Sequence, residues 1–249
     1  MNKTTDTHTT NQTIATICAR GGSKGLPLKN IKIFAEKPLI VHTIELALMS
    51  PSIDSVWVST DDEAIADIAR RAGAQVPYIR PAALATDDAP KLPVIEHLVQ
   101  HIESCGMSIN RVVDLQPTSP LRTVADIEGA IVASDGVPLL ASVRAASDNP
   151  YFNLVELDNM GVAHLSKGNG TSRRQDSPRV CALNGSIYVW QRNALKQAST
   201  EGLWSVKMGV FEMPAWRSVD IDNLEDFEYA QWLYSRHFFA SNRSVKGRL

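Results

Sequence analysis

Residues 14–30 read IATICARGGSKGLPLKN. The stretch begins with a short apolar, β-branched run at 14–18, which is typical of a buried strand. It then opens at Arg20 into a loop that combines glycines with several cations. Glycine lets backbone N–H groups approach an anion closely, and the cations neutralise its charge. The pattern therefore predicts a strand that ends in a phosphate-binding loop.

The loop matches neither of the two common phosphate-binding frames. No Gly-Lys-Ser/Thr ends a GxxxxGK[ST] pattern, and GxGxxG is absent. Arg20, Ser23 and Lys24, with the backbone amides around Gly22, would nevertheless hold a triphosphate. The amide of Asn30, a few residues on, offers a donor and an acceptor that could read the edge of a base. The alternative is a plain turn that carries solvated lysines.

Apolar segments at strand and helix spacing alternate beyond this loop. Strands are predicted at residues 14–18, 55–59, 76–78, 112–115 and 139–143, and helices at residues 38–50, 60–72, 92–103 and 124–134. This alternation predicts βαβ units and a parallel sheet covered on both faces. Ligands of such sheets bind beyond the carboxyl ends of the strands. Four segments follow strand ends and should line one mouth: the glycine loop, residues 60–62, Arg80 and residues 116–122.

The pattern changes after residue 145. Residues 151–157 and 162–165, with a turn between them, predict an antiparallel hairpin in an inserted lobe of about residues 146–182. Strands at 185–190, 207–212 and 218–221 and a helix at 223–238 then complete one domain, residues 14–238. We expect the Thr-rich residues 1–13 to be disordered and the basic residues 239–249 to be frayed.

The composition is that of an ordinary globular chain, with 249 residues, 44% of them hydrophobic and 21% charged. A net charge of −2 argues against a nucleic-acid partner. The apolar runs are too short to span a bilayer, and residues 1–13 lack the apolar core of a signal peptide. The three cysteines are widely separated and form no CxxC. They indicate reduced thiols in a cytoplasmic protein rather than a disulfide frame or a metal site.

Asp220 and Asp222 alternate along the last predicted strand, so their carboxylates should leave on one face. Paired carboxylates next to a triphosphate suit Mg²⁺, which binds one or two carboxylates together with phosphate oxygens and water. The alternative is structural: Asp222 would cap the next helix, with Glu225 as its capping-box partner.

Three further groups of residues allow two readings each. Arg80, held extended by the following proline, could contact a base or form a surface salt bridge. Residues 116–122 (QPTSPLR) match a polyhydroxylated or carboxylate-bearing ligand, or are a proline-stiffened loop whose hydroxyls cap a helix. Arg173, Arg174 and Arg179 form an anion clamp or are ordinary solvated charges.

Seven segments together resemble one family, the CMP-sialic acid synthetases, or acylneuraminate cytidylyltransferases. They run in the family's order between about residues 14 and 233: RGGSKGLPLKN, STDDEAIADIA, IRPAALATD, LQPTSPLR, SRRQDSPR, NGSIYVW and VDIDNLEDF. The segments TICARGGSKG, KLPVIEHL and NPYFNLVE are most similar to the legionaminic acid branch.

The resemblance implies a Rossmann-like nucleotidyltransferase fold, with three α/β/α layers, a mostly parallel sheet and a small inserted β lobe. In this family the lobe reaches across a homodimer to the partner's active site. The implied reaction joins CTP to a nine-carbon 2-keto-3-deoxy sugar acid and releases pyrophosphate, with Mg²⁺ as cofactor. Runner-up functions are a nucleotidyltransferase that acts on Kdo or a sugar 1-phosphate, and an inactive nucleotide-binding protein.

The resemblance also implies roles for individual residues. Catalysis would rest on Arg20, Lys24, Asp220 and Asp222, of which Asp220 and Asp222 would hold the metal. The nucleotide would contact Arg20, Gly22, Ser23, Lys24, Lys29, Asn30 and Arg80. The sugar acid would contact Gln116, Thr118, Ser119, Arg122, Arg173, Arg174 and Gln175.

Overall fold

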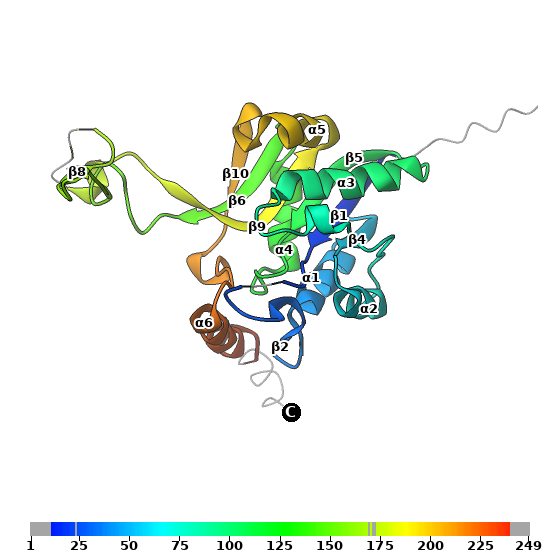
Figure 1. The fold of residues 1–249 in the computed structure, drawn as a ribbon. Helices are drawn as coiled ribbons and strands as arrows, with labels where there is room; N and C mark the ends of the chain where they lie inside the picture. Colours follow the sequence, from blue (N-terminus) through cyan, green and yellow to red (C-terminus); the bar gives the residue numbers. More distant parts are fainter. Residues whose placement is uncertain (1–10, 23, 169, 171–172, 240–249) are drawn as a thin grey trace, which may run out of the picture.

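The computed structural model describes residues 11–22, 24–168, 170 and 173–239. A six-stranded sheet forms its centre, in the order β10-β6-β9-β5-β1-β4 (Figure 1). Only β9 runs antiparallel to its neighbours. The strands are β1 (Gln12–Cys18), β4 (Ser55–Ser59), β5 (Ile109–Leu115), β6 (Leu139–Ala145), β9 (Cys181–Gln191) and β10 (Met208–Glu212).

Helices cover both faces of this sheet. Alternate side chains of β1 enter opposite cores: Ala15 and Ile17 pack in one, and Ile14 packs in the other. The first core receives α1 (Leu39–Leu48), α2 (Glu63–Arg71) and α4 (Val124–Ala133). The second core receives α3 (Lys91–Ser104) and α5 (Arg192–Glu201). The predicted three-layer α/β class with a mostly parallel sheet is therefore confirmed.

A third core lies beneath the loops at the carboxyl end of the sheet. It joins α6 (Leu224–Tyr234) to Phe34 of the short β2 (Ile33–Phe34), which lies between η1 (Lys29–Ile31) and β3 (Lys37–Pro38) in the chain. Leu26 of the glycine loop, Leu121 and Ile221 are all buried here. This packing fixes three loops that are far apart in sequence against one another.

A small lobe, residues 146–180, projects from the body between β6 and β9 (Figure 1). Its hairpin, β7 (Val155–Leu157) paired with β8 (Ala163–Leu165), confirms the predicted antiparallel hairpin. A short η3 turn (Arg174–Asp176) leads back to the sheet. The exposed apolar side chains of the lobe are Phe152, Leu154, Val155, Leu157, Met160 and Val162.

The strand β9 is longer than predicted and begins at Cys181. Its register with β6 shifts where Ala141 pairs with Tyr188 and Val143 pairs with Leu183. The bulge includes Gly185, whose φ is +71°. The strand was predicted to begin at Gly185, whereas in the fold Gly185 lies at an irregularity inside the strand.

Two predicted strands are wrong. Residues 76–78 have no strand pairing, and only isolated bridges join Gln75 and Ile79 to the neighbourhood of β4. Residues 218–221 run between η5 (Ala215–Arg217) and α6, and Ile221 donates one backbone bond to the carbonyl of Thr118 instead of pairing with a strand. Asp220 and Asp222 therefore lie on a loop, not at a strand end.

The boundaries of the predicted helices are correct to within a few residues. The side chain that caps α2 is Asp62, which accepts from the amide of Ile65. Helix α5 was not predicted, because its buried residues are few and small apart from Leu195. No helix within the described residues is long and apolar enough to cross a membrane.

Candidate active site

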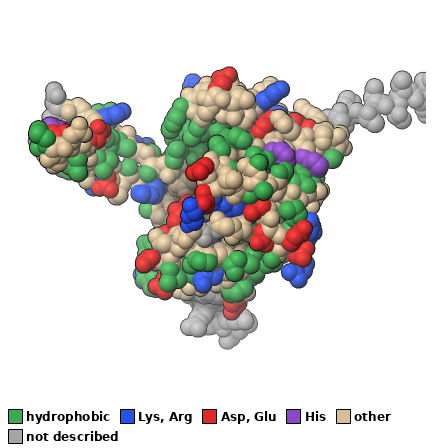
Figure 2. All heavy atoms as spheres, viewed as in Figure 1, with side chains coloured by type: hydrophobic (Ala, Val, Ile, Leu, Met, Phe, Trp, Pro, Cys, Tyr) green, Lys and Arg blue, Asp and Glu red, His purple; other side chains and the backbone are tan. Residues whose placement is uncertain are grey.

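A cavity of about 500 Å³ opens at the carboxyl ends of β1 and β5. Basic and acidic side chains lie side by side at the centre of the face shown in Figure 2. The glycine loop, Arg80, the segment after β5 and Asp222 all contribute to the lining. These loops therefore meet at one mouth, as predicted. Residues 60–62, which were also expected there, are not among the residues that line it. The cations that line the cavity are Arg20, Lys24, Lys29, Arg80 and Lys91.

The glycine loop is held by the carboxylates that follow β4. The amide of Gly21 donates to Asp61 Oδ1 at 3.2 Å. A Cβ on Gly21 would lie 2.7 Å from Asp62 Oδ2, so a larger residue would push the loop away. Gly22 is exposed, which leaves its backbone accessible to a ligand. Ser23, predicted to bind the triphosphate, lies outside the described residues.

Arg20 and Lys24 both contact Asp87. Arg20 Nη1 lies 2.9 Å from Oδ1, and Lys24 Nζ lies 2.5 Å from Oδ2. The hydrogen bond from Lys24 holds the pKa of this carboxyl below its usual range. Both cations line the cavity.

Arg80 and Asn30 are buried in the cavity wall. Arg80 Nη2 donates to Asp61 Oδ1 at 3.0 Å, so Arg80 forms a salt bridge, but a buried one rather than one on the surface. Asn30 Nδ2 donates to the carbonyl of Arg20 at 3.0 Å. Two of their polar atoms, Arg80 Nε and Asn30 Oδ1, have no hydrogen-bond partner in the part of the chain that the structure describes.

Lys29 reaches the segment before α6. Its Nζ donates to the carbonyl of Ile221 at 2.6 Å and to Asp222 Oδ1 at 3.0 Å. The alternative reading, in which Asp222 caps α6 with Glu225, is wrong by one residue. The cap is Asn223, and its capping-box partner is Asp226. This leaves the carboxylate of Asp222 at the cavity.

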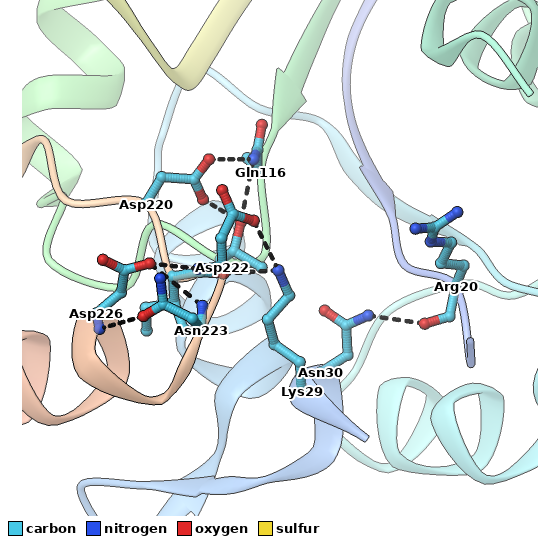
Figure 3. Close-up of polar contacts among 10 residues, drawn as sticks. Arg20, Lys29, Asn30, Gln116, Asp220, Asp222, Asn223 and Asp226 are labelled. Carbon is cyan, nitrogen blue, oxygen red and sulfur yellow. Dashed lines mark hydrogen bonds and ion pairs between the residues drawn. The ribbon is translucent and has the colours of Figure 1, made fainter. Parts of the chain in front are cut away.

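Asp220 lies next to Asp222, and the two carboxylates point toward Gln116 (Figure 3). Gln116 Nε2 donates to Asp220 Oδ2 at 2.9 Å, and the Thr118 hydroxyl donates to Oδ1. Burial raises the pKa of the Asp220 carboxyl. Its hydrogen bonds and the charge of Lys29 act in the opposite direction.

The two carboxylates fit Mg²⁺ in the way that this ion is usually bound. Within the described residues, no group of three or more His, Cys, Asp or Glu side chains is placed to hold a metal. Asp222 lines the cavity, and Asp220 is not among the lining residues but lies next to Asp222 (Figure 3). The two would supply two hard oxygen ligands, and Mg²⁺ commonly takes its remaining ligands from phosphate and water. The donor set is therefore complete only with a phosphate-bearing ligand in the cavity.

The side chain of Arg122 does not face the cavity. It is 1% exposed and donates to the carbonyls of Gln116 and Ser186 and, at 3.0 Å, to the hydroxyl of Thr43. Burial lowers the pKa of its guanidinium to about 9, which leaves it charged at neutral pH. This placement corrects the expectation that Arg122 contacts the sugar acid. Its side chain instead supports the loop from inside the protein.

The other residues of this loop that were expected to contact the sugar acid differ in their exposure. Gln116 and Thr118 line the cavity, whereas Ser119 is 1% exposed. A smaller cavity of about 160 Å³ adjoins the first through Lys91 and Gln116. Apolar and aromatic side chains form most of its wall, namely Leu92, Ile95, Tyr188, Trp190 and Leu203.

Comparison with known proteins assigns the family. The cytidylyltransferase family model matches residues 14–135. The CMP-N,N'-diacetyllegionaminic acid synthase of Campylobacter jejuni is 36% identical, over 89% of this chain and 94% of that protein. The post-translational flagellin modification protein B of Campylobacter coli is 35% identical, over 88% and 94%. This chain belongs to the cytidylyltransferase family.

A solved structure shares the fold of this cytidylyltransferase. The CMP-2-keto-3-deoxy-manno-octonic acid synthetase, solved in complex with CTP, superposes with a TM-score of 0.69. The match covers 92% of this chain and all of the other, at 21% identity. The resemblance read from the sequence motifs is thus confirmed at the level of family and fold.

The lobe of the cytidylyltransferase keeps its candidate residues away from the cavity of its own chain. Arg173 Nε pairs with Asp176 at 2.9 Å, and Arg174 donates to the carbonyl of Ser147. Neither arginine nor Gln175 is among the residues that line the cavity. Arg179 pairs with Glu212 of β10.

Several cavity residues of the cytidylyltransferase were missed from the sequence. Lys91 Nζ lies 2.6 Å from Asp114 Oδ2, at the first turn of α3. A lysine in the first turn of a helix interacts unfavourably with the helix dipole. Its presence there therefore indicates a partner outside the helix. Cys18 lines the cavity, and burial raises the pKa of its thiol to about 12. Asp87 carries no comparable signal, because its partners are more than 60 residues away.

Proposed function

We propose that this cytidylyltransferase activates a nonulosonic acid, a nine-carbon 2-keto-3-deoxy sugar acid of the sialic type, with CTP. The anomeric hydroxyl attacks the α-phosphorus, and its proton passes to water. A new bond forms between that oxygen and phosphorus, the bond to the β-phosphate breaks, and pyrophosphate leaves. The observation that carries the proposal is one cavity lined by five cations and by Asp222, with the carboxylate of Asp220 next to that of Asp222 (Figure 3).

The cations account for the binding of the triphosphate. Arg20 and Lys24, which line the cavity, would contact the β- and γ-phosphates, and the exposed backbone of Gly22 would add one N–H donor. The same two cations then stabilise the charge that develops on pyrophosphate as it departs. Phosphoryl transfer relies mainly on such positioning and charge stabilisation, with little covalent chemistry from the protein.

Asn30 and Arg80 supply base recognition. The unpartnered Asn30 Oδ1 would accept from the exocyclic amine of cytosine, and Arg80 Nε would donate to a ring acceptor. Uracil has an oxygen where cytosine has that amine, so a buried acceptor would reject UTP. Lys29 lies beside this region and contacts the ribose side of the nucleotide.

Asp220 and Asp222 would hold Mg²⁺. The ion supplies Lewis-acid polarisation of the α-phosphate when bound. Gln116 and Thr118 orient the Asp220 carboxylate through the two hydrogen bonds described above, and Lys29 orients Asp222.

The sugar acid would lie against Gln116 and Thr118, with Ser119 and Arg122 supporting the loop from within. We further propose a homodimer in which Arg173, Arg174 or Gln175 reaches the partner's cavity. The projection of the lobe and its exposed apolar side chains support this arrangement. We place the reaction in the cytoplasm, where nucleoside triphosphates are held and the free thiols stay reduced.

The test is release of pyrophosphate from CTP with a panel of sugars. Neuraminic, legionaminic and pseudaminic acids are compared with Kdo and with a sugar 1-phosphate, each with CTP or UTP and with or without Mg²⁺. We expect Mg²⁺-dependent release with CTP and one of the nonulosonic acids. Release only with Kdo or the sugar 1-phosphate, or none with any sugar, would overturn the proposal.

The dimer has its own test. Sedimentation should show a dimer at working concentration. Mixing a variant that carries Arg173→Ala and Gln175→Ala with a Lys24→Ala variant should restore activity, because one of the two shared sites is then intact. A monomer, or mixtures no more active than the variants alone, would remove the shared site.

A further inference from the structure

Each of the five cations that line the described part of the cavity is paired with a carboxylate. Three of the pairs link neighbouring parts of the scaffold: Lys29 with Asp222, Arg80 with Asp61 and Lys91 with Asp114. The remaining two cations, Arg20 and Lys24, share Asp87. They are also the two that the proposed function assigns to the β- and γ-phosphates.

Asp87 differs from the scaffold carboxylates in its position. Asp61 anchors the glycine loop as well as Arg80, and Asp114 is buried within β5. Asp87 lies instead on the connection between η2 (Ala82–Leu84) and α3, with its side chain 40% exposed. It uses one oxygen for each cation, and Arg20 Nη1 also reaches the carbonyl of Thr86 at 3.4 Å.

A carboxylate in this position competes with a phosphate group for these cations. Asp87 contacts Nη1 of Arg20 and Nζ of Lys24, and a phosphate that binds both cations must share or displace these contacts. An anionic phosphate brought beside Asp87 would also be repelled by it. Asp87 remains ionised at neutral pH, because its hydrogen bond from Lys24 lowers its pKa.

We propose that Asp87 is an affinity-setting residue that competes with the β- and γ-phosphates for Arg20 and Lys24. In the free enzyme it occupies the phosphate-binding side of these cations, it is displaced when CTP binds, and it returns as pyrophosphate leaves. The exchange lowers the affinity for CTP and for pyrophosphate together, so the product is released readily. This inference rests on the proposed function, because it takes the triphosphate as the ligand of the cavity.

The test compares Asp87→Asn with Asp88→Asn, the adjacent exposed carboxylate that does not line the cavity. Binding of CTP, inorganic pyrophosphate and CMP is measured by calorimetry, with and without Mg²⁺. Asp87→Asn should lower the Kd for CTP and for pyrophosphate about three- to tenfold, as expected from loss of two exposed ion pairs. The Kd for CMP, which lacks the β- and γ-phosphates, should not change, and Asp88→Asn should match the wild type.

Three results would overturn the inference. The Kd of Asp87→Asn for CTP could be unchanged, it could be higher than that of the wild type, or the Kd for CMP could fall by the same factor. Weaker binding confined to samples with Mg²⁺ would instead make Asp87 a metal ligand. Thermal unfolding of each variant checks the fold, and Asp87→Ser, which also removes the charge, should behave like Asp87→Asn. If the wild type binds no CTP at all, the proposed function fails first, so the two failures are distinguishable.

Discussion

The ammonium of Lys29 joins two segments almost 200 residues apart: its Nζ lies 3.0 Å from Asp222 Oδ1 and 2.6 Å from the carbonyl of Ile221. The lysine side chain is 14% exposed, whereas that of Asp222 is 74% exposed. A mostly buried cation thus fixes an open carboxylate at the rim of the cavity. Lys29 therefore positions the proposed metal ligand in addition to any contact with the nucleotide.

Replacing Lys29 with Gln should lower kcat/KM about 10- to 100-fold, because a hydrogen bond between charged groups is lost. The Mg²⁺ concentration for half-maximal rate should rise as well, since Asp222 is no longer held. Pyrophosphate release over a Mg²⁺ titration measures both quantities. Lys196→Gln, an exposed lysine of α5, is the matched control. A raised KM for CTP with an unchanged Mg²⁺ response would limit Lys29 to nucleotide binding.

Asp222 and Asn223 should separate metal binding from helix capping. Asn223 caps α6, so Asn223→Ala should lower the free energy of unfolding by about 1 kcal/mol. This corresponds to a decrease in Tm of about 2–4 °C. Asp222→Asn should leave Tm nearly unchanged but remove most of the Mg²⁺-dependent turnover. The opposite outcome, a lower Tm with normal turnover in Asp222→Asn, would restore the capping role.

Arg122 should act on stability rather than on sugar affinity. Arg122→Met leaves two carbonyls and the Thr43 hydroxyl without their buried donor. We expect a loss of about 3 kcal/mol, or about 6–12 °C in Tm. Thermal unfolding measures the loss, and Arg122→Lys should recover part of it. A normal Tm together with a raised KM for the sugar would show instead that Arg122 contacts the substrate.

The sheet could be predicted wherever local pattern and tertiary packing agree. The apolar run of β4 and the stripe of α1 are strong because each buries several large side chains. The VDID pattern at 219–222 has the same alternation as a strand, but its partner is the loop carbonyl of Thr118. Helix α5, in contrast, forms without a clear hydrophobic pattern. Arg192 supports its packing against α3 by donating to Glu96 and Glu103, and a hydrophobic pattern does not reveal such contacts.

The site could be predicted only as a set of loops. The position of strand ends brings the glycine loop, Arg80 and Gln116 to one mouth without any knowledge of side-chain directions. The pairing of charges could not be predicted in this way. Arg122 looked like a ligand contact because it follows two loop hydroxyls, yet it points inward to the carbonyl of Ser186. Such choices depend on contacts between residues far apart in sequence.

The stability of the core beneath the site should depend on pH through His42. This histidine is 6% exposed, its ring Nε2 lies 2.7 Å from the carbonyl of Phe34, and burial lowers its pKa. Below about pH 6.5, the ordinary pKa of a histidine, His42 binds a proton more readily in the unfolded chain than in the folded chain. The free energy of unfolding should therefore rise with pH through this window, with a slope of up to about 1.4 kcal/mol per pH unit from this group.

In His42→Gln, which keeps a donor for the Phe34 carbonyl, urea titrations between pH 5 and 7.5 should show a flatter slope. An equal slope in the wild type and in His42→Gln would assign the acid sensitivity to other groups.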